Sequence, residues 1–185
     1  IEDLDEKEMF DQYNVNVFGL LRLCKETIPL MRKQNSGVII NISSFLGKIG
    51  LPLLTLYNSS KYAVEGITDS LRYELSEFNI RVHSIMPGFF DTQFARDNLV
   101  TNLNTFDEKS PYSKTVSNLA PIIVEQINNG NDPKEVASII LEIIENENFL
   151  ARVTAGEKAK KFLPMKKELS DEDFERRVKE YYNIG

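Results

Sequence analysis

Residues 37–61 read GVIINISSFLGKIGLPLLTLYNSSK, and this stretch decides the fold. It opens with a glycine and a short β-branched run that ends at Ser43, which is the pattern of a buried strand. A loop with two glycines and Pro52 follows, and then a helix that carries Tyr57. A strand, a loop and a helix in this order predict one unit of an α/β protein.

The rest of the chain repeats this alternation. We expect helices at 4–33, 56–78 and 132–147, and strands at 37–43, 80–86 and 149–155. The last helix has the clearest start, because Asp132 can cap it and Pro133 suits its first turn. The helix at 56–78 has an apolar stripe at helical spacing, formed by Ala63, Ile67, Leu71 and Leu75. Strands separated by helices predict a parallel sheet.

Three side chains in this stretch suggest proton-transfer chemistry. Tyr57 and Lys61 lie four residues apart and therefore share one face of their helix. The ammonium favours the phenolate, so we expect it to lower the pKa of Tyr57 from about 10, which suits a general acid/base. Ser44 stands at the carboxyl end of the strand, where open α/β sheets meet ligands. A tyrosine and a lysine at this spacing are by themselves more often part of a solvated helix face, so the surroundings carry the prediction.

Five segments in order resemble the short-chain dehydrogenase/reductase family, over residues 1–155. They are DQYNVNVFG at 11–19, GVIINISS at 37–44, YNSSK at 57–61, IRVHSIMPG at 80–88 and DPKEVA at 132–137. They resemble the catalytic-asparagine helix, the strand before the catalytic serine, the Y-x-x-x-K motif, the strand before a Pro-Gly turn, and the start of a late helix. The region around Ser44 most resembles the hydroxysteroid and retinol dehydrogenase branch.

The resemblance implies a Rossmann-like, doubly wound parallel sheet and an oxidoreductase that moves a hydride between NAD(P) and an alcohol or carbonyl substrate. It assigns catalysis to Asn16, Ser44, Tyr57 and Lys61. It assigns cofactor contacts to Tyr57, Lys61, Pro87, Gly88, Phe90 and Thr92, and substrate contacts to Ser44, Phe45, Phe89 and Phe94. It also implies a homodimer or homotetramer.

In the implied mechanism Tyr57 exchanges a proton with the substrate oxygen, and Ser44 hydrogen-bonds that oxygen. Lys61 lowers the pKa of Tyr57 and bonds the nicotinamide ribose. Asn16 holds a water that links Lys61 to solvent. Two alternatives stay open: an epimerase or dehydratase of the same family, or a non-catalytic regulator on the same fold. The Pro87-Gly88 turn favours a simple dehydrogenase, and the presence of all four catalytic side chains favours an enzyme.

One departure from the family pattern is large. The family opens with a strand and a T-G-x-x-x-G-x-G turn and also carries an N-N-A-G strand end, and neither occurs in this sequence. We therefore expect residues 1–155 to be the C-terminal, catalytic half of one Rossmann-like domain, without its N-terminal dinucleotide-binding strands, and residues 156–185 to be a helical tail. The choice between NAD and NADP stays open, because it is made near the adenosine ribose.

The segment 93–131 is long for a connector and rich in Asn, Ser and Thr. At this place in the family lies the substrate lid. The residues beside the catalytic positions are apolar, and they include Phe45, Phe89 and Phe94. If they line the pocket, the substrate is largely apolar; the alternative is that half or more of them belong to the core.

Composition excludes several other classes. A chain of 185 residues with 42% hydrophobic and 27% charged residues can bury a core, and its net charge of −6 argues against broad nucleic-acid binding. The single cysteine, Cys24, excludes an internal disulfide, is expected to be a small core residue, and fits a reducing cytoplasm. No apolar run reaches the length of a transmembrane helix, and the single histidine, His83, has no metal-ligating partner at ligand spacing, so no metal site is predicted.

The tail at 156–185 interleaves lysines with Phe162, Leu163 and Met165. This pattern is compatible with contact to a membrane or an acidic surface. An amphipathic surface element is the more common outcome, and the acidic residues that follow dilute the positive charge.

Overall fold

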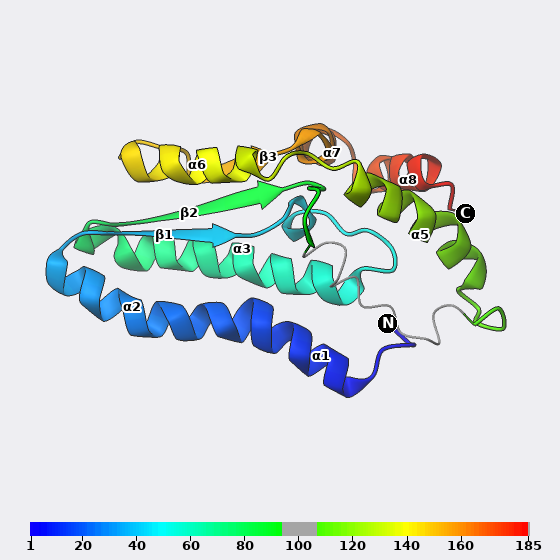
Figure 1. Cartoon of the computed structure of the whole chain (residues 1–185), viewed down its shortest axis with the longest axis horizontal. Coiled ribbons are helices and arrows are strands. Elements are labelled where there is room, and N and C mark those ends of the chain that lie inside the picture. Colours follow the sequence, from blue (N-terminus) through cyan, green and yellow to red (C-terminus); the bar gives the residue numbers. More distant parts are fainter. Residues whose placement is uncertain (94–106, 185) are drawn as a thin grey trace.

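The computed structural model describes residues 1–93 and 107–184 (Figure 1). Its centre is a three-stranded parallel sheet in the order β1-β2-β3, formed by β1 (Gly37–Ile42), β2 (Ile80–Pro87) and β3 (Arg152–Ala155). Gly37 lies opposite Ile80, and Ser84 lies opposite Arg152. The predicted parallel sheet is confirmed, although the third strand begins three residues later than the sequence suggested.

Helices cover both faces of this sheet, which makes it doubly wound. On one face lie α1 (Glu6–Tyr13), α2 (Leu20–Gln34) and α3 (Thr55–Leu75), and on the other lies α6 (Lys134–Glu145) (Figure 1). Between α2 and the sheet, Cys24 packs with Ile39 and Val82; across the sheet, Ile85 packs with Ile143. The predicted burial of Cys24 is confirmed, and a parallel sheet with both faces covered is the expected home for β-branched strands.

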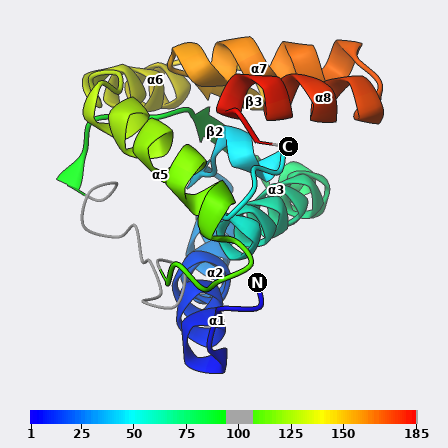
Figure 2. The same ribbon diagram turned by 90° about the vertical axis from the view of Figure 1, so that its right-hand side faces the viewer.

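Three more helices gather at the carboxyl end of the strands. They are α5 (Ser113–Asn128), α7 (Glu157–Glu168) and α8 (Asp171–Tyr182), and the last two form an antiparallel pair (Figure 2). The buried residues of these helices form one hydrophobic cluster with the loop after β1. The cluster includes Phe45, Leu46, Ile49, Leu51, Leu119, Ile123, Phe162, Phe174 and Tyr182. The tail is therefore part of the main core. Its Phe162 is 1% exposed, and Leu163 and Met165 pack against the same cluster.

The first helix differs from the single helix expected at 4–33. Asp5 begins α1 with a capping box, in which the Glu8 amide donates to Asp5 Oδ1 at 2.7 Å. The helix then widens into a π-helical segment, η1 (Asn14–Gly19), before α2 resumes. Such widenings often occur at functional sites, and this one carries Asn16.

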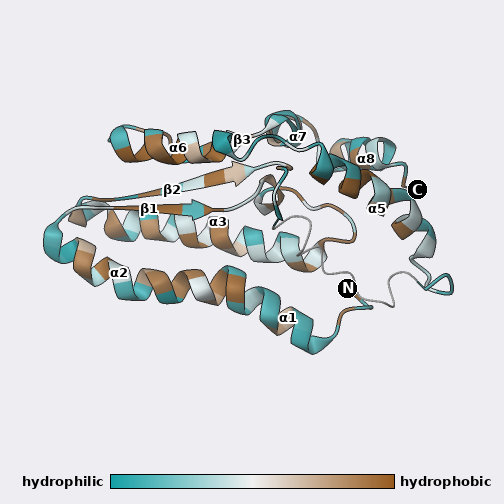
Figure 3. Cartoon of the chain, viewed as in Figure 1, coloured by the Kyte–Doolittle hydropathy of each residue, from teal (hydrophilic) through white to brown (hydrophobic). Residues whose placement is uncertain are grey.

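The helix expected at 56–78 is α3 followed by a short 3₁₀ turn, η3 (Ser76–Phe78). Its buried face differs from the predicted stripe, because Ala63 and Ile67 are only partly buried while Val64, Glu65 and Thr68 are fully buried. In Figure 3 hydrophobic residues recur along α2, α3 and α6 among hydrophilic ones, as expected for helices on a sheet. Within the described ranges, no helix has the combination of length and hydrophobicity that crossing a membrane requires.

Candidate active site

Ser44 lies where β1 ends and a 3₁₀ turn, η2 (Phe45–Gly47), begins. Its side chain is buried, and its Oγ accepts a hydrogen bond from the Leu46 amide at 3.1 Å. The same hydroxyl donates to the Pro87 carbonyl oxygen, 3.5 Å away, at the end of β2. Two strand ends therefore converge on Ser44, at the edge where parallel sheets meet ligands.

Tyr57 and Lys61 project from α3 beside this serine. The Lys61 Nζ lies 5.6 Å from the centre of the Tyr57 ring and donates to the Ile42 carbonyl oxygen at 3.0 Å. Ile42 is the last residue of β1. The Ser44 hydroxyl also lies close enough to the phenol to act on the pKa of Tyr57. The structure thus brings Ser44, Tyr57 and Lys61 together, as the spacing of the motifs predicts.

The electrostatics differ from the sequence-based expectation. Burial raises the pKa of Tyr57, and the Ser44 hydroxyl, which lowers that pKa, does not offset it. Burial also lowers the pKa of Lys61, from 10.5 to about 8. The expected lowering of the Tyr57 pKa by Lys61 is therefore wrong for this chain. The ammonium lies over the tyrosine ring and bonds a backbone carbonyl, so burial decides the direction.

Asn16 reaches the same helix through an intermediate residue. Its Nδ2 donates to Ser60 Oγ at 3.0 Å, and Ser60 Oγ donates to the Tyr57 carbonyl oxygen at 2.7 Å. Ser60 is completely buried. The π-helical segment is therefore tied to the helical turn that runs from Tyr57 to Lys61.

The Pro-Gly turn closes the other side of the site. The Gly88 amide donates to the Ala155 carbonyl oxygen at 2.8 Å, and a Cβ at Gly88 would lie 3.0 Å from the Ala159 backbone nitrogen. The turn therefore leaves little room for a side chain at this position. Phe90 is buried and forms a parallel bridge with Asn131, and Thr92 is partly buried.

The predicted substrate contacts Phe45 and Phe89 differ in burial. Phe45 is 1% exposed and packs edge-on against Phe89 at 5.6 Å between ring centres, whereas Phe89 is only partly buried. Phe45 therefore belongs to the core cluster, and its contact with substrate stays a prediction. Phe94 lies outside the described residues.

No group of three side chains suited to a metal ion occurs in residues 1–93 and 107–184. His83 is buried in β2, where its Nδ1 lies 2.8 Å from the Leu150 carbonyl oxygen. Burial lowers the pKa of His83. This placement suits a structural histidine.

Sequence reasoning missed two buried polar residues of α3, Ser60 and Glu65. Each had a signal. Ser60 precedes the lysine in the motif, in a helix interior where serine is disfavoured unless its hydroxyl has a partner. Glu65 lies one helical turn after Lys61, among apolar residues, where a carboxylate needs a buried partner.

The donors at this edge fit one end of a nicotinamide dinucleotide. An ammonium and a phenol offer donors to ribose hydroxyls, and a serine hydroxyl can bond the oxygen of a substrate. The pyrophosphate end of such a cofactor has no matching glycine-rich turn in these 185 residues. Asn16, Ser44, Tyr57 and Lys61 form the candidate active site.

Comparisons with known proteins show the family and the fold of the chain. The sequence model described as short chain dehydrogenase matches residues 1–102. A 3-ketodihydrosphingosine reductase from Bacteroides thetaiotaomicron is 35% identical over 156 residues, which are 84% of this chain and 57% of that protein. Retinol dehydrogenase 8 from Bos taurus is 30% identical over 149 residues, which are 78% of this chain and 47% of that protein.

The solved structures show the same fold. A short-chain dehydrogenase from Streptomyces avermitilis superposes with a TM-score of 0.74 at 27% identity, covering 99% of this chain and 63% of that one. A short chain dehydrogenase/reductase from Burkholderia phymatum in complex with NAD gives 0.73 at 22% identity, covering 96% and 62%. The chain thus spans somewhat more than half the length of several proteins that it matches.

Proposed function

We propose that this chain, which belongs to the short-chain dehydrogenase family, carries the catalytic residues of an oxidoreductase. The enzyme would move a hydride between NAD or NADP and an alcohol or carbonyl compound. The observation that carries this proposal is the meeting of Ser44, Tyr57 and Lys61 at the carboxyl edge of the sheet. The bound nicotinamide would supply or accept the hydride. The protein would orient the substrate and handle the proton.

In this proposal Tyr57 is the general acid/base. Its raised pKa keeps the phenol protonated near neutral pH, so it is ready to give its proton to a carbonyl oxygen during reduction. Ser44 lies close to Tyr57 and donates to the Pro87 carbonyl, and it would hold the substrate oxygen beside the phenol. In the oxidative direction the same phenol must first lose its proton, which burial makes harder.

Lys61 and Asn16 have supporting roles. Lys61, with a pKa of about 8, is mostly protonated at pH 7 and would donate to the nicotinamide ribose. Asn16 would hold a water that connects Lys61 to solvent. Pro87, Gly88, Phe90 and Thr92 would line the nicotinamide end of the cofactor site, where the β2 strand ends. The complex of the Burkholderia phymatum relative with NAD supports a nicotinamide cofactor, and that of a Burkholderia cenocepacia relative with NADP leaves the choice between the two open.

The substrate is proposed to be largely apolar. Phe89 packs against Phe45, the residue after Ser44, and α5, inside the proposed lid at 93–131, brings Leu119, Ile122 and Ile123 to the cluster that Tyr57 touches. Exchanging residues 93–131 for those of a relative should change the ranking of substrates by kcat/KM. We also propose a cytoplasmic homodimer or homotetramer; the single cysteine supports the compartment, and family membership supports the assembly.

The proposal is tested with the whole protein and NADH or NADPH that carries deuterium at C4 of the nicotinamide. A panel of apolar ketones and aldehydes should yield alcohols that carry the deuterium on the former carbonyl carbon. Release of unlabelled product without net cofactor oxidation would indicate an epimerase or dehydratase. Nicotinamide binding by isothermal titration without turnover of any compound in the panel would indicate a non-catalytic regulator. Either result contradicts the proposed function.

A further inference from the structure

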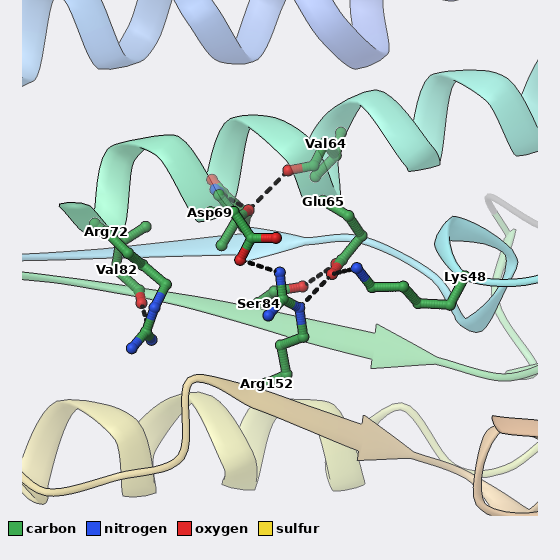
Figure 4. A network of polar contacts seen from close by, with 10 residues as sticks. Lys48, Val64, Glu65, Asp69, Arg72, Val82, Ser84 and Arg152 are labelled. Atoms are coloured by element: carbon green, nitrogen blue, oxygen red, sulfur yellow. Dashed lines mark hydrogen bonds and ion pairs between the residues drawn. The ribbon is translucent and has the colours of Figure 1, made fainter. Parts of the chain in front are cut away.

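Glu65 is a charged side chain in an almost fully buried position. It lies on α3, four residues after Lys61 and eight after Tyr57, and is 2% exposed. Figure 4 shows its carboxylate pointing from α3 toward the sheet, where it meets side chains from three other parts of the chain. A buried carboxylate is costly unless it is paired, so these partners explain why it can stay there.

The partners come from β2, β3 and the turn that follows Ser44. Ser84 donates from β2 to Glu65 Oε1, and Arg152 Nε donates from β3 to Oε2 at 2.6 Å. Ser84 and Arg152 lie opposite each other in the sheet, so one carboxylate joins two strands. Lys48 Nζ lies 3.4 Å from Oε2 and brings in the turn after η2.

The Glu65 carboxylate is ionised near neutral pH. Burial by itself would raise the pKa of Glu65. The hydrogen bonds from Ser84 and Arg152, with contributions from Ser43 and Lys48, nevertheless lower that pKa below its usual value. The negative charge that attracts Lys48 and Arg152 is therefore present near neutral pH.

The turn held by Lys48 is packed directly against the helix. A Cβ at Gly47 would lie 2.8 Å from Ser43 Oγ, 2.9 Å from the Lys61 carbonyl oxygen and 3.0 Å from Glu65 Cγ. The backbone after Ser44 thus rests on α3 between Lys61 and Glu65. A shift of this turn relative to α3 would change the distance between Ser44 and Tyr57.

We propose that Glu65 is a positioning residue, which sets the placement of Ser44 against Tyr57 by fixing the turn at 45–48 and strands β2 and β3 to α3. This inference rests on the proposed function for its kinetic consequence, but its structural part does not depend on it. Loss of the carboxylate charge would leave Lys48 without its partner in this turn and loosen the contact between the turn and the helix. A displacement of the reacting groups by about 1 Å can reduce a rate by about a hundredfold.

The test compares Glu65→Gln with Asp69→Asn in the whole protein. Asp69 lies one turn further along α3 and bonds the same Arg152, whereas Lys48 forms its ion pair with Glu65 and acts on Asp69 only as a more distant charge. The two variants therefore make the same chemical change on the same helix. The readouts are kcat and KM for NADPH- or NADH-dependent carbonyl reduction, and the ¹³Cζ chemical shift of Tyr57 at pH 7, which reports its hydrogen bonding and is assigned with Tyr57→Phe.

Glu65→Gln is expected to lower kcat by about tenfold to a hundredfold with KM changed less than about twofold, and to move the Tyr57 signal. Asp69→Asn is expected to leave both at the parent values. If Glu65→Gln lowers the melting temperature but leaves kcat and the Tyr57 signal unchanged, the positioning role is refuted.

A second variant covers the case in which Glu65→Gln does not fold. Lys48→Met removes the ion pair between the turn and Glu65 but leaves Glu65 paired with Ser84 and Arg152. The Lys48 side chain is partly exposed. This variant should move the Tyr57 signal in the same direction, and an unchanged signal refutes the proposal. A parent protein without nicotinamide-dependent turnover would refute the proposed function, while the Tyr57 signal would still decide the role of Glu65.

Discussion

Two effects act on the pKa of Tyr57 in opposite directions. Burial disfavours the phenolate, while the Ser44 hydroxyl favours it, and the net effect raises the pKa. A protonated phenol is the form that donates to a carbonyl oxygen. Near neutral pH the phenol of Tyr57 is therefore in the protonated form that the proposed reduction would use.

Replacing Tyr57 with Phe removes the transferable proton and keeps the ring. We expect kcat of the whole protein to fall by about a hundredfold or more, which is the usual size of a general acid/base contribution. The fold should be retained, since the ring still packs at the edge of the core cluster. The measurement is steady-state reduction near pH 7 with the best substrate of the panel. A kcat within a few fold of the parent would contradict the assignment of Tyr57.

The lowered pKa of Lys61 makes the stability of the protein depend on pH. Its pKa falls from 10.5 to about 8 on folding, so the partly buried ammonium costs up to roughly 3 kcal/mol, less the part that solvent screens, when it is charged in both states. This cost is fully present below pH 8. It declines between pH 8 and 10.5, where the unfolded chain binds a proton that the folded chain has released.

We therefore expect Lys61→Met to stabilise the protein at pH 7 by about 1–3 kcal/mol while it abolishes activity. The gain should shrink as the pH rises from 8 toward 10.5. Urea unfolding of variant and parent at both ends of this range measures it. A variant less stable than the parent at pH 7 would show that the hydrogen bond to Ile42 outweighs the cost of burial.

At the scale of elements, the π-helical segment and α3 are joined through one hydroxyl. Asn16 donates to Ser60, and Ser60 donates to the Tyr57 carbonyl oxygen. Widening of the helix at Asn14–Gly19 accompanies the placement of Asn16 against α3. This contact connects two helices that are far apart in the sequence.

A double-mutant cycle with Asn16→Ala and Ser60→Ala measures this connection. Each change removes one side of a partly buried hydrogen bond, so we expect a coupling free energy of about 1 kcal/mol. The free energies of unfolding of the parent, the two single variants and the double variant give this value. Additive losses would show that the two side chains act independently.

At the scale of the whole molecule, strand β1 is an edge of the described sheet. It pairs with β2 on one side only, and its Ile42 is 44% exposed. An apolar strand with an open edge favours association with other strands. The sequence also carries no glycine-rich turn for a pyrophosphate.

We therefore expect a polypeptide of these 185 residues alone to bind NADH or NADPH weakly and to be inactive. Fluorescence titration with either dinucleotide measures binding, and light scattering measures association. Micromolar affinity together with turnover would contradict this expectation and show that these 185 residues suffice for the whole cofactor site.

Much of the fold follows from local patterns in the sequence. Apolar periodicity and turn residues predicted the parallel strands and most helices, because these signals lie within one element. The boundaries and the π-helical segment were not predictable in this way. The burial of α7 and α8 against Phe45 also depends on neighbours that are distant in the chain.

The sequence alone showed the resemblance to the family, which the comparisons confirm. It also determined that Ser44 stands at the end of a strand and that Tyr57 and Lys61 lie one turn apart on a helix, because these are local properties. Only the tertiary structure decided how those groups ionise and what holds them. Burial depends on residues from many segments, and it reversed the expected direction of the Tyr57 pKa. The tertiary structure also placed Glu65 between β2, β3 and the turn after Ser44. A carboxylate on a helix can be read from the sequence, but its partners are defined only when the distant strands come together.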